Sequence, residues 1–258
     1  RKEGPNLANM KILGASSDIL NVLVMLTHEA DMEIVKNATL ALSVAAFHEH
    51  NNGSMGRMPE CVDAMVRLCS APDNEVQAQA AAALANLGYG HELNQRLIGE
   101  MGGIERLLDL CCGRDVDVIE SSTAALANLV CLHKGNASKV SKVGGIQVLL
   151  RLVSSSVPAN LLDSDQMNEI QANAAEALAN LTSTYGEENA AQLHSLGVAP
   201  LVLMCGSGNL QVRRHAALVL GNVSQSDEHR AAIGLRGGVE AMVYLCEKED
   251  DVTRANAL

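Results

Sequence analysis

The sequence predicts an all-α protein, built as a solenoid of stacked helical repeats. The phrase ALANL stands at residues 83–87, 125–129 and 177–181, and a looser version, VLGNV, stands at 219–223. The asparagines of these phrases, which we call the anchor positions, follow one another at intervals of 42, 52 and 42 residues, and such a period indicates stacked repeats. Composition agrees, because 48% of the chain is hydrophobic and only 2% is aromatic, which suits close packing of aliphatic helices.

The longest helix of each predicted unit ends near the anchor position. Counted back from this position, with Val44 in the first unit, apolar or small residues recur at spacings that a helix gathers on one face. They are Ile34, Val76, Val118, Ile170 and Val212 ten residues before it; Ala38, Ala80, Ser122, Ala174 and Ala216 six before; and Leu42, Leu84, Leu126, Leu178 and Leu220 two before. We predict a long third helix in each unit, with this face buried.

Polar residues mark where these helices begin. Thirteen residues before the anchor position stand Asp31, Asp73, Asp115 and Asn209, whose side chains can accept hydrogen bonds from the free amides at a helix start. We predict that they are N-caps. Their spacing disfavours a catalytic role, because a whole repeat separates each carboxylate from the next.

Two shorter helices precede the long helix in each unit. Apolar segments predict a second helix at 20–26, 62–68, 104–110, 146–152, 198–204 and 239–245. Directly before three of these stand Gly102-Gly103, Gly144-Gly145 and Gly237-Gly238, where the chain must turn sharply. A phosphate-binding loop is the competing interpretation, but the strand and the Lys-Ser/Thr context of such loops are missing. Segments 94–101, 136–143, 189–196 and 229–235 predict a still shorter first helix.

The order of these elements resembles the armadillo repeat. A short helix, a Gly-Gly turn, a GGIxxLLxL helix and a D/NxxVxxxAxxALANL helix recur in phase over nearly the whole chain. The resemblance implies a right-handed superhelical solenoid of three-helix repeats that forms one domain over residues 1–258. Its repeats would lie near 6–50, 51–91, 92–133, 134–185 and 186–227, with a partial repeat at 228–258. HEAT repeats are the near alternative, but they have two helices and usually lack the Asn and the glycine pair.

One unit is longer than its neighbours by ten residues, since its anchor interval is 52 rather than 42. The additional residues lie between the second and third helices, in a segment rich in Ser and Asp that contains Pro158. We predict a surface loop at 154–166. Two interpretations stay open for it: a tolerated insertion, or a segment for partner contact or phosphorylation.

The resemblance also implies where a ligand binds. In armadillo proteins the third helices line a concave groove, and the Asn that matches the anchor position bonds the main chain of an extended peptide. The matching residues here are Asn86, Asn128, Asn180 and Asn222. Val44 occupies the first anchor position, so the first repeat should lack the amide that bonds the peptide main chain. The alternative interpretation is that these amides bond only within the protein.

Charged residues on the same helix face predict the character of the ligand. The candidate groove residues eleven, eight and four before the anchor positions are Glu75, Asp117, Glu120, Glu169, Glu176 and Arg214. An acidic middle and a basic end favour a protein or peptide ligand with Lys or Arg near its middle, and a merely solvated acidic face is the alternative. Importin-α-type receptors carry Trp four residues before the Asn. This chain has Ala82, Ala124, Glu176 and Leu218 there, which argues against nuclear import.

Composition limits the function classes further. A formal net charge of −11 disfavours nucleic-acid binding, which usually needs a basic surface. No apolar run is long enough to span a bilayer, so we expect membrane association only through regions outside this chain. Seven cysteines without a CxxC pair predict structural thiols in a reducing, cytoplasmic compartment. Four of them, Cys69, Cys111, Cys205 and Cys246, recur at one repeat position.

Catalytic signatures are missing from the sequence. No GxSxG, HExxH or Walker sequence occurs, and His48-x-His50 is a weak metal pair, so we predict neither a cofactor nor a metal. We predict a non-catalytic scaffold or adaptor that holds an extended peptide or a helix in the groove. Two alternatives stay open: a transport adaptor of the nuclear-import type, and an acyl-anchored armadillo-only protein that tethers organelles or motors at a membrane.

Overall fold

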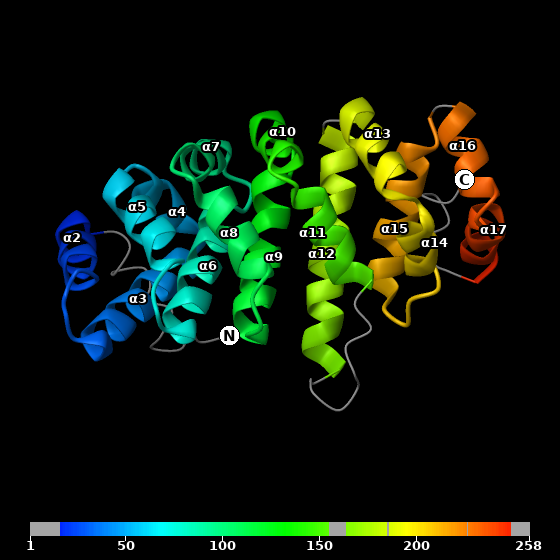
Figure 1. Ribbon diagram of the computed structural model, residues 1–258. Helices are drawn as coiled ribbons and strands as arrows, with labels where there is room; N and C mark the ends of the chain where they lie inside the picture. The colour runs from blue at the N-terminus through cyan, green and yellow to red at the C-terminus, as the bar shows by residue number, and fades with distance from the viewer. Residues whose placement is uncertain (1–15, 155–163, 185, 226, 249–258) are drawn as a thin grey trace, which may run out of the picture. The chain divides into compact units, whose positions relative to one another are not determined.

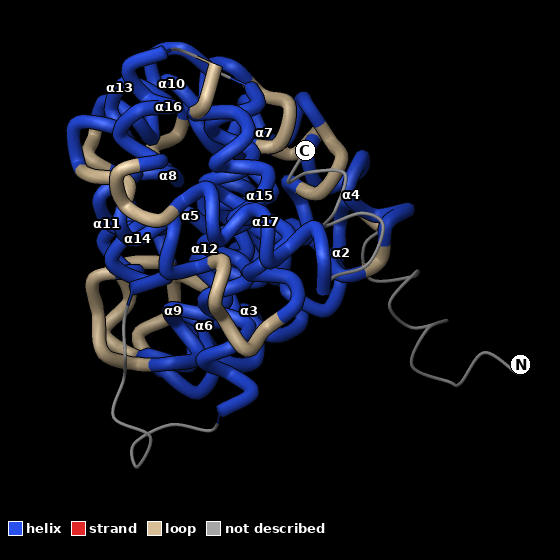
Figure 2. The backbone as a smooth tube through the Cα atoms, turned by 90° about the vertical axis from the view of Figure 1, so that its right-hand side faces the viewer, coloured by secondary structure: helices blue, strands red, loops and turns tan. Residues whose placement is uncertain are grey.

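The computed structural model describes residues 16–154, 164–184, 186–225 and 227–248. Throughout these residues the regular structure is helical, and Figure 2 shows the described chain as helix and loop without a strand. The chain divides into two compact units, which meet between Leu129 and Val130. None of the described helices combines the length and the apolar character that crossing a membrane needs.

In the first unit, the third helices lie side by side and the shorter helices pack against them (Figure 1). The third helices described there are α3 (Met32–Phe47), α6 (Asn74–Gly88) and α9 (Val116–Val130); the second helices are α2 (Ser17–Leu26), α5 (Pro59–Leu68) and α8 (Gly103–Cys111); the first helices are α4 (Glu49–Gly56) and α7 (Glu92–Glu100). Leu42, Leu84 and Leu126, two residues before each anchor position, are fully buried. The buried face predicted for the third helices is confirmed at these positions.

The second unit repeats the arrangement. Its described third helices are α12 (Ser164–Thr184) and α15 (Leu210–Val223); its second helices are α11 (Gly145–Ser154), α14 (Ala199–Met204) and α17 (Gly238–Lys248); its first helices are α10 (Lys134–Lys142), α13 (Gly186–Leu196) and α16 (Asp227–Gly234). The third helices α12 and α15 pack along each other. Leu178 and Leu220 are buried between the helices, in the same register as in the first unit.

One position of the predicted apolar register is wrong. Ile34 remains 38% exposed, whereas its neighbour Val35 is 5% exposed. Among the described residues α3 has no earlier third helix beside it, so this end of the stack offers one packing surface fewer than the interior helices have.

The four predicted N-caps are confirmed. Each side chain accepts a hydrogen bond from a backbone amide two or three residues further along the chain. The bonds run from the amides of Glu33, Glu75, Val118 and Gln211 to Asp31, Asp73, Asp115 and Asn209, at 2.9, 3.0, 3.1 and 2.8 Å. These bonds satisfy amides that have no partner inside the first turn of a helix.

The Gly-Gly turn at 102–103 needs its two glycines for different reasons. Gly102 has a φ angle of +83°, in the left-handed region that favours glycine. Gly103 is buried, and a Cβ atom there would lie 2.5 Å from Ile98 Cγ2 and 2.9 Å from the Ile98 carbonyl oxygen. A side chain at position 103 would therefore push the first and second helices of this repeat apart. Gly237 and Gly238 show the same pair of features.

The predicted loop at 154–166 was too long at both ends. α11 extends to Ser154 and α12 begins at Ser164, so residues 154 and 164–166 are helical. Asp165 lies in the first turn of α12, where the helix dipole stabilises a carboxylate. Residues 155–163 lie outside the described residues, and for them the loop stays a prediction.

Candidate functional site: the third-helix face

Within each unit the predicted ligand-binding residues lie on one face of the third helices. We call it the third-helix face and define it as the anchor positions together with the residues four, eight and eleven before each of them. The anchor amides Asn86, Asn128, Asn180 and Asn222 are half-buried. The residues next to Asn86 in the chain, Ala85 and Leu87, are buried. The anchor amides therefore lie at the border of the core, within reach of solvent.

The two anchor amides of the first unit differ in their bonding. Asn128 Nδ2 donates a hydrogen bond to the Ala85 carbonyl oxygen of α6, at 2.9 Å, so this amide helps to hold α9 against α6. The Asn86 side chain forms no hydrogen bond with any residue that the structure describes. Both side chains keep an amide oxygen that no described residue binds.

The last anchor amide, Asn222 in the second unit, resembles Asn128 in its bonding. Asn222 Nδ2 donates to Thr182 Oγ1 at 3.1 Å and to Ser183 Oγ at 2.9 Å, both near the end of α12. The nitrogen of the amide thus ties two neighbouring third helices together. Its oxygen, like those of the first unit, has no partner among the described residues. An amide both donates and accepts, so the oxygen could still receive a bond from a ligand.

Amides of the first helices hold the backbone that carries the anchor residues. Asn52 Nδ2 of α4 donates to the Asn86 carbonyl oxygen at 2.9 Å, and Gln95 Nε2 of α7 donates to the Asn128 carbonyl oxygen at 2.8 Å. The last carbonyl groups of a helix have no partner within the helix, so these bonds stabilise the end of each third helix. The ends of α6 and α9 are therefore each held by the first helix of the same repeat.

A buried amide also holds the end of α6, at Leu87, the residue after Asn86. Asn94, which is 1% exposed, donates to the Leu87 carbonyl oxygen at 2.8 Å and to the Asn52 carbonyl oxygen at 3.1 Å. Equivalent contacts join Asn51 to Ala45, Asn189 to Leu181 and His229 to Val223, at 2.8, 2.8 and 3.1 Å. This role was not predicted from the sequence. Its signal was the recurrence of Asn94, Asn136 and Asn189 eight or nine residues after the anchor positions.

In the first unit an ion pair joins two repeats on the third-helix face. Lys36 Nζ lies 2.9 Å from Asp73 Oδ2 and 3.4 Å from Glu75 Oε2. Its hydrogen bonds with Asp73 and Glu75 raise the pKa of Lys36, and the bond from Lys36 lowers the pKa of Asp73. Glu75 therefore shares its charge with a residue of the same face. Asp117 is exposed and Glu120 is half-buried on α9.

In the second unit the charged residues differ in burial. Glu169 is exposed, whereas Glu176 is half-buried, and burial raises the pKa of the Glu176 carboxyl. Burial also raises the pKa of the Cys131 thiol, and the negative charge of Glu176 adds to this effect. Arg214 on α15 is half-buried beside His215, whose pKa is lowered by burial and then by the Arg214 charge.

Comparison with known proteins identifies the repeat. A model of the armadillo/beta-catenin-like repeat matches residues 57–88 and 91–131. The crystal structure of an engineered protein is 30% identical to this chain and superposes with a TM-score of 0.81, and the match covers 94% of both chains. The chain belongs to the armadillo-repeat family.

Further comparisons support the armadillo fold. The crystal structure of another engineered protein is 30% identical with a TM-score of 0.86, and the match covers 98% of this chain and 59% of that one. A designed armadillo repeat protein, solved in complex with the peptide (KR)4, is 22% identical with a TM-score of 0.79 over 92% of this chain and 96% of its own. A search of curated proteins gives no match. The armadillo solenoid predicted from the sequence is confirmed.

The cysteines of this armadillo chain lie in the core more often than on the surface. Cys69, Cys111 and Cys205, three of the four that share a repeat position, are buried, and Cys246 is half-buried. Burial raises the pKa of Cys69 to about 12 and that of Cys205 to about 11, so these thiols stay protonated at neutral pH. They behave as small apolar side chains.

The described residues offer no evident metal site. No group of three or more His, Cys, Asp or Glu side chains converges there. The rings of His48 and His50 lie 5.3 Å apart in an edge-to-face arrangement.

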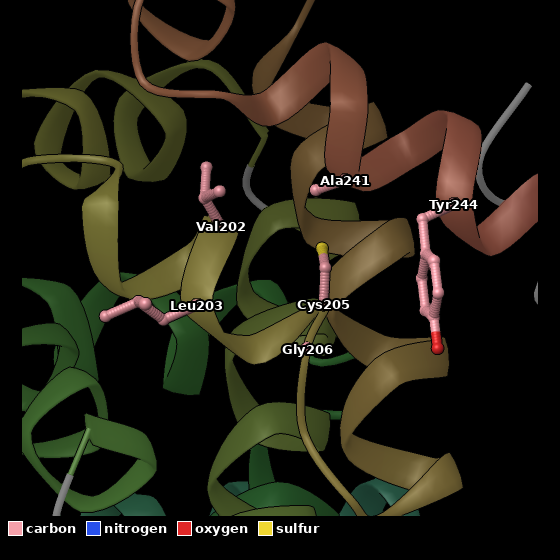
Figure 3. Close-up of a pocket in the computed structure, with 6 residues that line it drawn as sticks. All are labelled: Val202, Leu203, Cys205, Gly206, Ala241 and Tyr244. Carbon is pink, nitrogen blue, oxygen red and sulfur yellow. The ribbon is translucent and has the colours of Figure 1, made fainter.

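An apolar pocket lies elsewhere in the armadillo array, between the second helices α14 and α17 (Figure 3). Its volume is about 340 Å³, and it is lined by Val202, Leu203, Cys205, Gly206, Ala241 and Tyr244. In Figure 3 the Tyr244 hydroxyl points away from the Cys205 sulfur. The pocket shares no residue with the third-helix face, so its residues serve as controls for that face.

Proposed function

We propose that this armadillo protein is a non-catalytic scaffold that holds extended peptide segments of a partner along the third-helix face within each unit. The observation that carries the proposal is the amide oxygen of Asn86, Asn128 and Asn222, which recurs at the edge of the core and has no partner among the described residues. A half-buried acceptor at a repeating position suits a ligand whose own donors repeat. The peptide main chain is such a ligand.

The spacing of the helices supports this assignment. Packed helices lie about 8–10 Å apart, and an extended chain advances about 3.3 Å per residue. One anchor amide would then meet the ligand every two to three residues. Asn can bond a peptide group without contacting its side chain, so the amides would fix the path of the ligand and not its sequence.

The energy of these bonds requires further contacts. Each bond contributes about 1 kcal/mol net, whereas association costs several kcal/mol. We propose that the additional contacts are ionic and that the ligand carries Lys or Arg opposite Glu75, Asp117 and Glu120 in the first unit and Glu169 and Glu176 in the second. The basic peptide in the related designed protein supports this choice.

The test uses labelled (KR)4 peptide as the probe. We expect the double variant Asn86→Ala/Asn128→Ala to bind it about 30-fold more weakly in a fluorescence anisotropy titration, because two bonds of about 1 kcal/mol are lost. Asn21→Ala, an exposed Asn on α2 and away from the face, is the matched control. Unchanged binding by a folded double variant would refute the proposal.

A further inference from the structure

The first third helix replaces the anchor amide with an apolar surface. Val44 stands at the anchor position of α3. Four residues before it Leu40 is 46% exposed, and three residues after it Phe47 is 69% exposed. Phe47 is the only Phe in the chain. Exposure of these side chains on the side that carries the binding positions in later repeats needs a reason, because isolated folding would favour burying them.

The next third helix extends this surface. Tyr89, three residues after the anchor position of α6, corresponds to Phe47 of α3 and is 72% exposed. α3 and α6 pack against each other along their length, and Figure 1 shows them as neighbours. The two aromatic rings therefore stand at corresponding sequence positions, Phe47 as the last residue of α3 and Tyr89 directly after the end of α6, and Leu40 lies about two helical turns before Phe47. Aromatic side chains supply a large part of the binding energy in protein interfaces.

Charge changes along the same face of this unit. Lys36 lies one turn before Leu40, but Asp73 and Glu75 offset its charge. Beyond it, α6 and α9 carry the carboxylates of Glu75, Asp117 and Glu120. The face is thus apolar over the later part of α3, from Leu40 to Phe47, with the exposed Glu33 at its start, and acidic at α9, which complements a ligand that is apolar at one end and basic further on.

We propose that the first unit binds an extended peptide that has a large apolar residue at one end and Lys or Arg about two to six residues away. The separation follows from one helix spacing of about 8–10 Å between α3 and α6, or two between α3 and α9, divided by about 3.3 Å per extended residue. The apolar residue packs on Leu40, Phe47 and Tyr89. This inference rests on the proposed function and adds the composition and placement of the ligand.

The experiment compares peptides of equal length and charge. Labelled (KR)4 is altered by replacing its terminal Lys-Arg pair with Leu-Phe, at the N-terminus in one peptide and at the C-terminus in another. Matched peptides carry Gly-Ser in the same places. We expect one of the Leu-Phe peptides to bind the protein about tenfold more tightly than its Gly-Ser counterpart, because an apolar side chain leaves water on binding.

Surface variants locate the effect. Phe47→Ser and Tyr89→Ser should each reduce the advantage of Leu-Phe over Gly-Ser and leave the affinity for the Gly-Ser peptide unchanged. Leu203→Ser is the matched control, because Leu203 is 74% exposed but lies on the second helix α14. Since Phe47 and Tyr89 are exposed, their variants should keep the melting temperature of the parent protein.

Three results would overturn the inference. If (KR)4 and the Gly-Ser peptides bind but Leu-Phe gives no advantage, the inference fails and the proposed function stands. If no peptide binds, including (KR)4, the proposed function fails and the inference fails with it. If the protein self-associates in sedimentation experiments and Phe47→Ser abolishes this, the apolar surface belongs to a contact between two copies.

Discussion

Asn86 and Asn128 stand in the same five-residue phrase, one repeat apart, yet the structure uses them differently. Asn128 donates a bond to the Ala85 carbonyl oxygen of the preceding third helix, whereas the Asn86 side chain bonds no described residue. The identical phrase therefore covers one amide that contributes to packing and one whose side chain bonds no described residue. Mutation of Asn128 should therefore change both the stability of the protein and its ligand binding, whereas mutation of Asn86 should change ligand binding alone.

The largest effect should be a loss of stability on mutation of Asn94, the buried residue that holds the end of α6 next to Asn86. Asn94→Ala removes two hydrogen bonds and leaves the Leu87 and Asn52 carbonyl groups without that partner in a buried setting. We expect a loss of about 2–3 kcal/mol in the free energy of unfolding, measured by urea denaturation. A loss below about 0.5 kcal/mol, the size expected for the surface control Asn21→Ala, would show that the buried amide is dispensable.

Asn128→Ala should affect both properties. The variant loses the bond to Ala85, so we expect about 1 kcal/mol less stability, together with about fivefold weaker binding of the (KR)4 peptide. Urea denaturation and anisotropy on the same preparation measure the two effects. A stable variant with weak binding would show that the packing bond contributes nothing, and the contrast with Asn86 would disappear.

Asn86→Ala should affect binding alone. No described residue loses a side-chain bond, so we expect stability to stay within about 0.5 kcal/mol of the parent while (KR)4 binds about fivefold more weakly. Asn86→Asp sharpens the result, because a carboxylate keeps the acceptor and loses the donors. If Asn86→Asp binds as well as the parent, the ligand uses the oxygen of the amide.

The smallest effect concerns the second unit and its half-buried acid. Burial raises the pKa of Glu176, so this carboxylate becomes protonated at a higher pH than an unperturbed Glu does as the solution is acidified. The charge that attracts a basic ligand is present above the pKa and lost below it. We expect acidification to weaken (KR)4 binding, and Glu176→Gln to remove up to about fivefold of that pH dependence. Glu240→Gln, an exposed Glu on α17, should leave the profile unchanged.

Residue types and spacing predicted most of the fold. The N-caps at Asp31, Asp73, Asp115 and Asn209 were found because capping is local chemistry that a short stretch of sequence contains. α4 was missed because its sequence, EHNNGSMG, has weak helix propensity. Its position depends on tertiary bonds instead, such as the one from Asn51 to the Ala45 carbonyl oxygen.

The candidate site was predictable in its position but not in its bonding. The recurring phrase located all four anchor amides on the third helices, at the edge of the core. It could not distinguish Asn86 from Asn128, because the partner of Asn128 lies 43 residues away in the chain. Likewise, Lys36 and Glu75 belong to different repeats, so their ion pair follows from stacking and not from local sequence.

The bonds from Asn52 to Asn86 and from Gln95 to Asn128 join the first and the third helix of one repeat, which the second helix separates along the chain. A protein engineer who wishes to graft the Asn128 position into another array should therefore not cut the donor segment at the start of α9. The segment should begin early enough to include α7, so that the amide supporting the helix end travels with it. A module transferred without α7 would carry the Asn128 side chain but lose the Gln95 bond that holds the end of its helix.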